Sequence, residues 1–220
     1  MPTPKPARNA TLWNQGWMAA GAALLILAWP FSLFLPVRIS WENGVLENTQ
    51  VVVLLVASIQ ACRTASSDVG RRTYIWSGAA ILLIILTLRE LSWGAVFQEP
   101  ISVTTHGPTF SSSRLWYRPL VAPIIGAAAF GALLLILFGR PIAFLKECAA
   151  NACLPLMEFL GFAIAMLLST AAESHMGMSL DVWPGDLQVV EETVETAAYM
   201  FIAAGLAKTS YLATRTNKTR

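Results

Sequence analysis

The chain has 220 residues, of which 55% are hydrophobic and only 13% are charged, and its mean hydropathy is +0.57. An ordinary soluble domain carries roughly a quarter charged residues, so this composition excludes a soluble globular fold. It also excludes a disordered chain and a disulfide-rich secreted module, because the apolar content is too high for the first and three cysteines are too few for the second. We therefore expect a single integral membrane domain over residues 1–220.

Six apolar stretches are long enough to cross a bilayer, which takes about 20 helical residues. They cover residues 16–37, 45–62, 74–97, 119–138, 150–170 and 189–213. The run from Ala80 to Leu86 is apolar on every face, whereas a strand of an outer-membrane barrel alternates in polarity over about 10 residues. The first stretch is too long for a signal peptide and lacks a clear cleavage site. The pattern predicts an all-α, six-helix transmembrane bundle.

Lysine and arginine residues divide unequally between the two ends of these helices. With both termini in the cytoplasm, the inner side holds 11 basic and three acidic residues, and the outer side holds four basic and ten acidic residues, giving net charges of +8 and −6. The inner basic residues are Lys5, Arg8, Arg63, Arg71, Arg72, Arg140, Lys146, Lys208, Arg215, Lys218 and Arg220, and the outer ones are Arg38, Arg89, Arg114 and Arg118. Since basic loops stay in the cytoplasm, we expect a bacterial inner-membrane protein with both termini cytoplasmic.

Ionisable residues on three of the predicted helices lie in the outer half of the bundle. Glu47 opens the second helix, Arg89 and Glu90 lie near the end of the third, and Glu192 and Glu195 lie one turn apart at the start of the sixth. The helix dipole stabilises a carboxylate at a helix N-terminus but disfavours one near the C-terminus, so it does not account for Glu90. Charges inside a membrane usually have a partner or a function. We therefore expect these five residues to converge as candidate catalytic residues.

One arginine facing four carboxylates leaves an excess of negative charge, which protons or a divalent cation would balance. Two histidines in predicted outer loops could add a ligand or a general base. The candidate metal ligands are Glu47, Glu90, Glu192, Glu195, His106 and His175. The alternative is a set of structural salt bridges around Arg89 without a ligand. No other cofactor is indicated.

The inner half of the bundle contains one carboxylate, Glu158, within the fifth predicted helix. Lys208 or Arg140 is long enough to reach it, so we expect a structural ion pair. The cysteines also lie at inner helix ends and form neither a Cys-x-x-Cys nor a zinc spacing. We expect Cys62, Cys148 and Cys153 to be reduced, small apolar side chains.

Three motifs stand at the outer ends of predicted helices: ENGVLE at 42–47, RELSWG at 89–94 and EETVE at 191–195. They resemble the Glu-x-Gly-x-x-Glu, acidic-x-Ser-Trp-Gly and Glu-Glu-x-x-Glu motifs of a family of bacterial polytopic membrane proteins. The resemblance implies a site at the outer ends of these helices and no particular activity. Arg89 stands where the family usually has a second acid, so the motifs do not carry over a metal-ligand set.

These features predict a small inner-membrane enzyme or binding protein whose outward-facing acidic pocket takes a lipid-linked or periplasmic substrate. A carboxylate would act as general base or hold a cation, and Arg89 would bind a phosphate or carboxylate group. One alternative is a non-catalytic subunit of a membrane complex, and a third choice is a cation- or proton-coupled carrier. The expected partners are membrane lipids and, for the subunit, other membrane proteins. Nucleic acid is not expected, because topology explains the basic residues.

Overall fold

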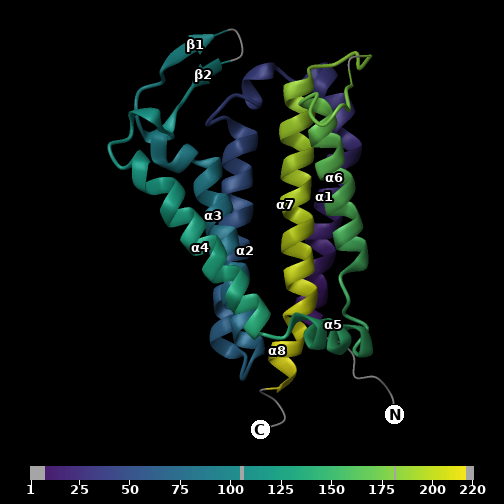
Figure 1. Cartoon of the computed structure of the whole chain (residues 1–220). Helices are drawn as coiled ribbons and strands as arrows, with labels where there is room; N and C mark the ends of the chain where they lie inside the picture. The colour runs from purple at the N-terminus through teal and green to yellow at the C-terminus, as the bar shows by residue number, and fades with distance from the viewer. Residues whose placement is uncertain (1–7, 105–106, 181, 217–220) are drawn as a thin grey trace.

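The computed structural model describes residues 8–104, 107–180 and 182–216. Within these ranges the protein is helical apart from one short hairpin (Figure 1). The α-helices are α1 (Arg8–Phe34), α2 (Val45–Ser67), α3 (Arg72–Glu90), α4 (Arg118–Phe138), α5 (Pro141–Ala150), α6 (Leu156–Ala172), α7 (Leu187–Thr209) and α8 (Tyr211–Thr216). The 3-10 helices are η1 (Val37–Ile39), η2 (Ser92–Phe97) and η3 (Ser112–Arg114), and strands β1 (Ser102–Thr104) and β2 (Gly107–Thr109) pair antiparallel. The predicted all-α class is confirmed.

Successive long helices run in opposite directions along the bundle, and α1 begins at the end where α8 ends (Figure 1). Helix α7 packs against α1, α2 and α6, while α3 packs between α2 and α4. Among the described residues, the segments with the predicted inner charges therefore lie at one end of the bundle, and those with the predicted outer charges lie at the other end with the hairpin.

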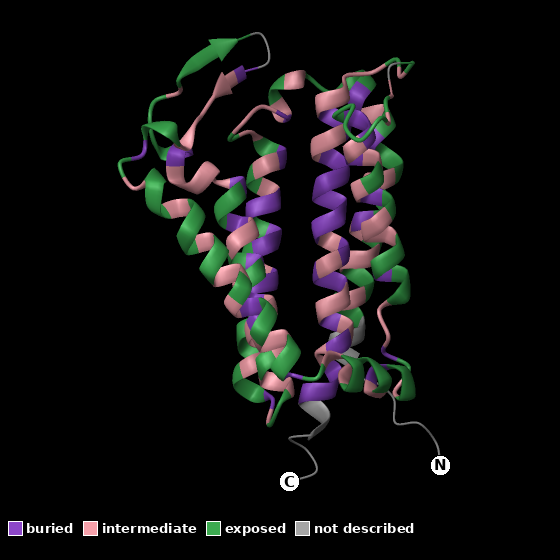
Figure 2. Ribbon diagram, viewed as in Figure 1, coloured by how far each residue is buried: buried purple, intermediate pink, exposed green. Residues whose placement is uncertain are grey.

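Helix α7 is the central helix, and Figure 2 shows buried residues along most of its length. Small side chains allow its neighbours to approach closely, as is common between membrane helices. Those buried in α7 include Ala197, Ala198, Ala203, Ala204 and Ala207. Gly161 on α6 makes room for the ring of Phe201, since a Cβ there would lie 2.7 Å from it. The core of the bundle thus follows α7.

Helix α4 is the most peripheral of the long helices. Ala132 is its buried residue, and it meets α3 at Gly78, where a Cβ would lie 2.7 Å from the Ala132 carbonyl oxygen. Away from this contact α4 diverges from α3 toward the hairpin end (Figure 1). Its exposed apolar side chains include Ile124, Phe130 and Leu137. An apolar surface of this kind is typical of contact with lipid or with another membrane protein.

Four helical segments are long and apolar enough to cross a membrane: Leu12–Phe34, Val45–Ser67, Arg72–Glu90 and Arg118–Phe138. They indicate a membrane-associated protein. Helix α6 is apolar but has 17 residues, and α7 has 23 residues but contains three glutamates and a lysine.

Several predicted helix boundaries differ from those of the structure, two of them at positive φ angles: α1 covers Arg8–Phe34, α2 extends to Ser67, and the sixth predicted span is divided into α7 and α8. The third predicted span reached residue 97, but α3 ends at Glu90 because Trp93 and Gly94 adopt positive φ angles of 59° and 97°. The fifth was predicted to begin at residue 150, but α6 begins at Leu156, after Ala152 at a φ of 54° and Pro155. The separate helix α5 was not predicted. Side-chain packing and local backbone geometry, rather than apolar runs, set these ends.

Candidate functional site

The RELSWG motif ends α3 and fixes its last turn. Trp93 adopts a left-handed conformation that is strained for a bulky residue, and its carbonyl oxygen accepts a 2.8 Å hydrogen bond from the hydroxyl of Tyr117. Gly94 follows with a positive φ, and a Cβ there would lie 2.9 Å from the same hydroxyl. The chain therefore turns away immediately after Arg89 and Glu90, which leaves both at the hairpin end of the bundle.

Glu90 points into the bundle, where only 7% of it is exposed. Its Oε1 accepts a 2.7 Å hydrogen bond from the hydroxyl of Tyr199 on α7, which is also buried. The same oxygen lies 3.9 Å from Nε of Arg89. A buried carboxylate needs such partners, because its desolvation is otherwise costly.

Arg89 lies between two carboxylates that come from different helices. Its Nη2 is 3.9 Å from Oε1 of Glu195 on α7, and 53% of its side chain is exposed. Glu195 is buried and accepts a 3.3 Å hydrogen bond from Ser169 on α6. Both contacts of Arg89 are ion pairs that are longer than a hydrogen bond. The guanidinium N–H groups therefore make no hydrogen bond to Glu90 or Glu195.

Glu192 forms a separate contact with α2. Its Oε2 accepts a 2.8 Å hydrogen bond from Nε2 of Gln50, which also donates to the Glu192 carbonyl oxygen at 3.1 Å. Gln50 is fully buried, and its Oε1 has no hydrogen-bond partner among the described residues. A buried oxygen without a hydrogen-bond partner costs free energy.

Glu47 stands at the start of α2 and is only partly buried. Its Oε2 accepts a hydrogen bond from the backbone N–H of Asn43. The five predicted residues thus lie at one end of the bundle on α2, α3 and α7. Arg89, Glu90 and Glu195 form the closest group, whereas Glu47 and Glu192 bind their own partners.

The predicted metal site finds no support in this geometry. Over residues 8–104, 107–180 and 182–216, no group of three or more His, Cys, Asp or Glu side chains is arranged to hold an ion. His106 lies outside the described residues. His175 is largely exposed, and its Nδ1 is 2.7 Å from Oε2 of the nearby Glu173. Helix rotation separates the carboxylates, because Glu192 faces Gln50 while Glu195 faces Arg89.

At the other end of the bundle, the expected pairing of Glu158 is confirmed. Its Oε2 lies 3.1 Å from Nζ of Lys208, and its Oε1 accepts a 2.8 Å hydrogen bond from Asn14 on α1. Of the two cations expected from the sequence, Lys208 is the partner, and Arg140 is exposed. This cluster joins α1, α6 and α7 and is a structural contact.

Three residues of the candidate site were not predicted as members: Gln50, Ser169 and Tyr199. Tyr199 follows Glu195 by four residues and therefore shares its helix face, a spacing that could have indicated it. Gln50 is likewise three residues from Glu47. Ser169 offers no such signal, because only the packing of α6 on α7 brings it to Glu195.

Comparisons with protein-family models, with curated proteins and with solved structures found no match to this chain. A half-exposed guanidinium can bind an anionic oxygen, and adjacent carboxylates can accept protons.

Proposed function

We propose that this chain is a multi-pass protein of the bacterial inner membrane, with six spanning helices and both termini in the cytoplasm. The four long apolar helices support this arrangement, as does the unequal division of basic residues between the two ends. Helix α6 has 17 residues and so a length of about 26 Å, close to the roughly 30 Å of a hydrocarbon core. Lys208 lies in the last turn of α7, where it can reach an interface, and the more deeply placed Glu195 is paired with Arg89.

We infer that the outer end of this bundle binds the anionic group of a lipid-linked or periplasmic substrate. One observation carries this function: the guanidinium of Arg89 is half-exposed and lies 3.9 Å from both Glu90 and Glu195, without a hydrogen bond to either. A phosphate or carboxylate group could take two of its N–H donors at once.

The two carboxylates near Arg89 would then have different roles. Glu90 is held by Tyr199, so it orients Arg89 and balances its charge. Glu195 is held more weakly, at 3.3 Å from Ser169, and is the better general base for a water molecule or a substrate hydroxyl group. In the binding-protein form, the same groups would hold the substrate without reaction.

A pair of lipids tests this function. The purified protein in nanodiscs should bind a polyprenyl phosphate and should not bind the corresponding uncharged polyprenol. Arg89→Gln should weaken the binding at least tenfold, which corresponds to about 1.4 kcal/mol for a lost charge-assisted hydrogen bond. Arg114→Gln removes an exposed charge at the same end and is the matched control. Equal binding of both lipids, or unchanged binding by Arg89→Gln, would reject the proposal.

The subunit alternative is favoured by one observation, the exposed apolar surface of α4. A photo-reactive residue at Ile124, which is exposed, should form a crosslink to a protein partner in native membranes if α4 is an interface. Crosslinks to lipid alone would leave α4 as a lipid-facing helix and remove the support for a subunit.

A further inference from the structure

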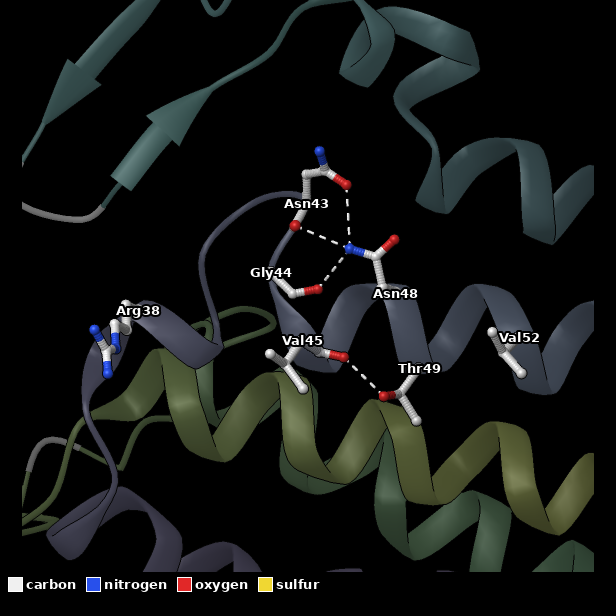
Figure 3. Close-up of a pocket in the computed structure, with 7 residues that line it drawn as sticks. All are labelled: Arg38, Asn43, Gly44, Val45, Asn48, Thr49 and Val52. Atoms are coloured by element: carbon white, nitrogen blue, oxygen red, sulfur yellow. Dashed lines mark hydrogen bonds between the residues drawn. The ribbon is translucent and has the colours of Figure 1, made fainter.

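A groove of about 550 Å³ lies on the outer surface of α2, at the hairpin end of the bundle (Figure 3). Its lining residues are Arg38, Asn43, Gly44, Val45, Asn48, Thr49 and Val52. Four of them share one face of α2, at intervals of three, four and seven residues from Val45. Glu47 is two residues from Val45 and lies on the other side of the helix, and its carboxylate reaches the groove lining only at the backbone N–H of Asn43.

The polar end of the groove has a fixed shape. Nδ2 of Asn48 donates to the carbonyl oxygen and Oδ1 of Asn43, at 2.9 and 3.1 Å, and to the carbonyl oxygen of Gly44 at 2.8 Å. These bonds hold Asn43 at a φ of 59°, in the left-handed region. Position 44 requires glycine because the backbone of Trp41 lies close to it, and a Cβ at Gly44 would lie 2.5 Å from the carbonyl oxygen of Trp41. The groove therefore does not need a ligand to form.

The same end carries the cation of Arg38. Arg38 is exposed and forms no ion pair within the described part of the chain. Of the two nearest acids along the chain, Glu42 accepts a 2.5 Å hydrogen bond from the N–H of Phe110, and Glu47 accepts one from the backbone N–H of Asn43, so neither is paired with Arg38. Helix α2 begins here without a side-chain cap, so its first N–H groups add partial positive charge.

The groove face of α2 also carries exposed apolar side chains, on either side of Asn48 and Thr49. Val45 is 66% exposed and Val52 is 58% exposed, and Ile59 continues the same face as an exposed side chain. If α2 crosses the membrane as proposed, this strip lies among acyl chains while Arg38 lies at the level of the head groups. The groove surface thus has a cation, Arg38, at one end and apolar side chains further along α2.

We propose that this groove binds an anionic glycerophospholipid, with its phosphate at Arg38 and an acyl chain along Val45, Val52 and Ile59. Charge complementarity identifies the lipid class, because a net negative head group supplies the counter-ion that Arg38 lacks. The inference rests on the proposed membrane placement of α2 and is independent of the activity proposed for Arg89.

Native mass spectrometry of the detergent-solubilised full chain, titrated with phosphatidylglycerol, tests the proposal. One lipid should bind saturably and more tightly than phosphatidylcholine, which has the phosphate but no net charge. Arg38→Gln should weaken phosphatidylglycerol binding about fivefold, as expected for one basic residue at a membrane surface. Val52→Asn should weaken it as well, by removing the apolar contact. Arg114→Gln is the charge-matched control and should bind like the wild type.

Several outcomes would overturn the lipid site: equal weakening by Arg38→Gln and Arg114→Gln, equal affinity for both lipids, or displacement by soluble glycerol phosphate at the lipid's own concentration. The last outcome would identify a site for free phosphate. Thermal melting of each variant verifies that it is folded. Arg38→Gln should still bind polyprenyl phosphate, so loss of the groove and loss of the Arg89 site are separately detected.

Discussion

The hydroxyl of Tyr199 and the carboxylate of Glu90 form a 2.7 Å hydrogen bond between α7 and α3, across 109 residues of sequence. Both residues are buried, and Tyr199 also belongs to the hydrophobic cluster that α2, α3 and α7 share. This hydrogen bond determines the position of the Glu90 carboxylate, and the same carboxylate lies beside Arg89.

Tyr199→Phe should therefore destabilise the protein. The variant keeps the ring but leaves Glu90 without its donor, which costs about 1–3 kcal/mol for a buried group. Thermal melting in detergent measures the loss. Tyr74→Phe, at an exposed tyrosine, is the matched control and should melt like the wild type. Identical melting of both variants would show that the Tyr199 hydroxyl contributes nothing.

Arg89→Ala should lower stability more at alkaline pH than at acidic pH. The guanidinium offsets the charges of Glu90 and Glu195, and protonating Glu195 removes the repulsion that its loss exposes. Because Arg89 is half-exposed and both contacts are 3.9 Å, the loss should be about 1 kcal/mol, below that of a fully buried pair. Melting curves across pH, with Arg118→Ala as control, measure it. A deficit that grows as the pH falls would contradict this account.

Lys208→Met should be among the most destabilising substitutions. It would leave Glu158, which is 3% exposed, without its cation, and breaking a buried pair costs about 3–5 kcal/mol. The double variant Glu158→Gln with Lys208→Met should recover most of this loss, because it leaves no unpaired charge. Chemical unfolding of the single and double variants gives the coupling free energy. Additive losses would mean that the two side chains do not interact.

The three cysteines should differ in reactivity. Burial raises the pKa of the Cys148 thiol to about 12, and it also raises the pKa of Cys153. The reactive thiolate of Cys148 is therefore scarce until the pH approaches that value. Cys62 is exposed. A maleimide at neutral pH should label Cys62 in the folded protein, and Cys62→Ser should stay unlabelled until denaturant is added. Fast labelling of folded Cys62→Ser would contradict the buried environment.

Alkaline phosphatase fusions test the proposed topology. Fusions after Asn43, Ser111 and Asp186, all at the hairpin end, should be active because that end would face the periplasm. Fusions after Asp68 and Arg220 should be inactive. An active fusion at Arg220 would reverse the orientation and place the acidic site in the cytoplasm.

The sequence by itself determined the helical class and the two ends of the bundle. Long apolar runs must form helices in a membrane, because only a helix satisfies its own backbone polar groups there. The charge at each end follows from where the loops fall along the chain. Sequence also indicated that Glu47, Arg89, Glu90, Glu192 and Glu195 share one end, because depth along a helix depends only on residue count.

Tertiary structure decided which of these side chains meet. The rotation of each helix about its axis is set by packing, such as that of Gly161 against Phe201, and depth does not determine it. This rotation directs Glu195 to Arg89 but Glu192 to Gln50, so four acids at one level do not form one metal site. The bond from Tyr199 to Glu90 is decided in the same way, because α7 and α3 become neighbours of the same cluster only when the whole bundle has packed.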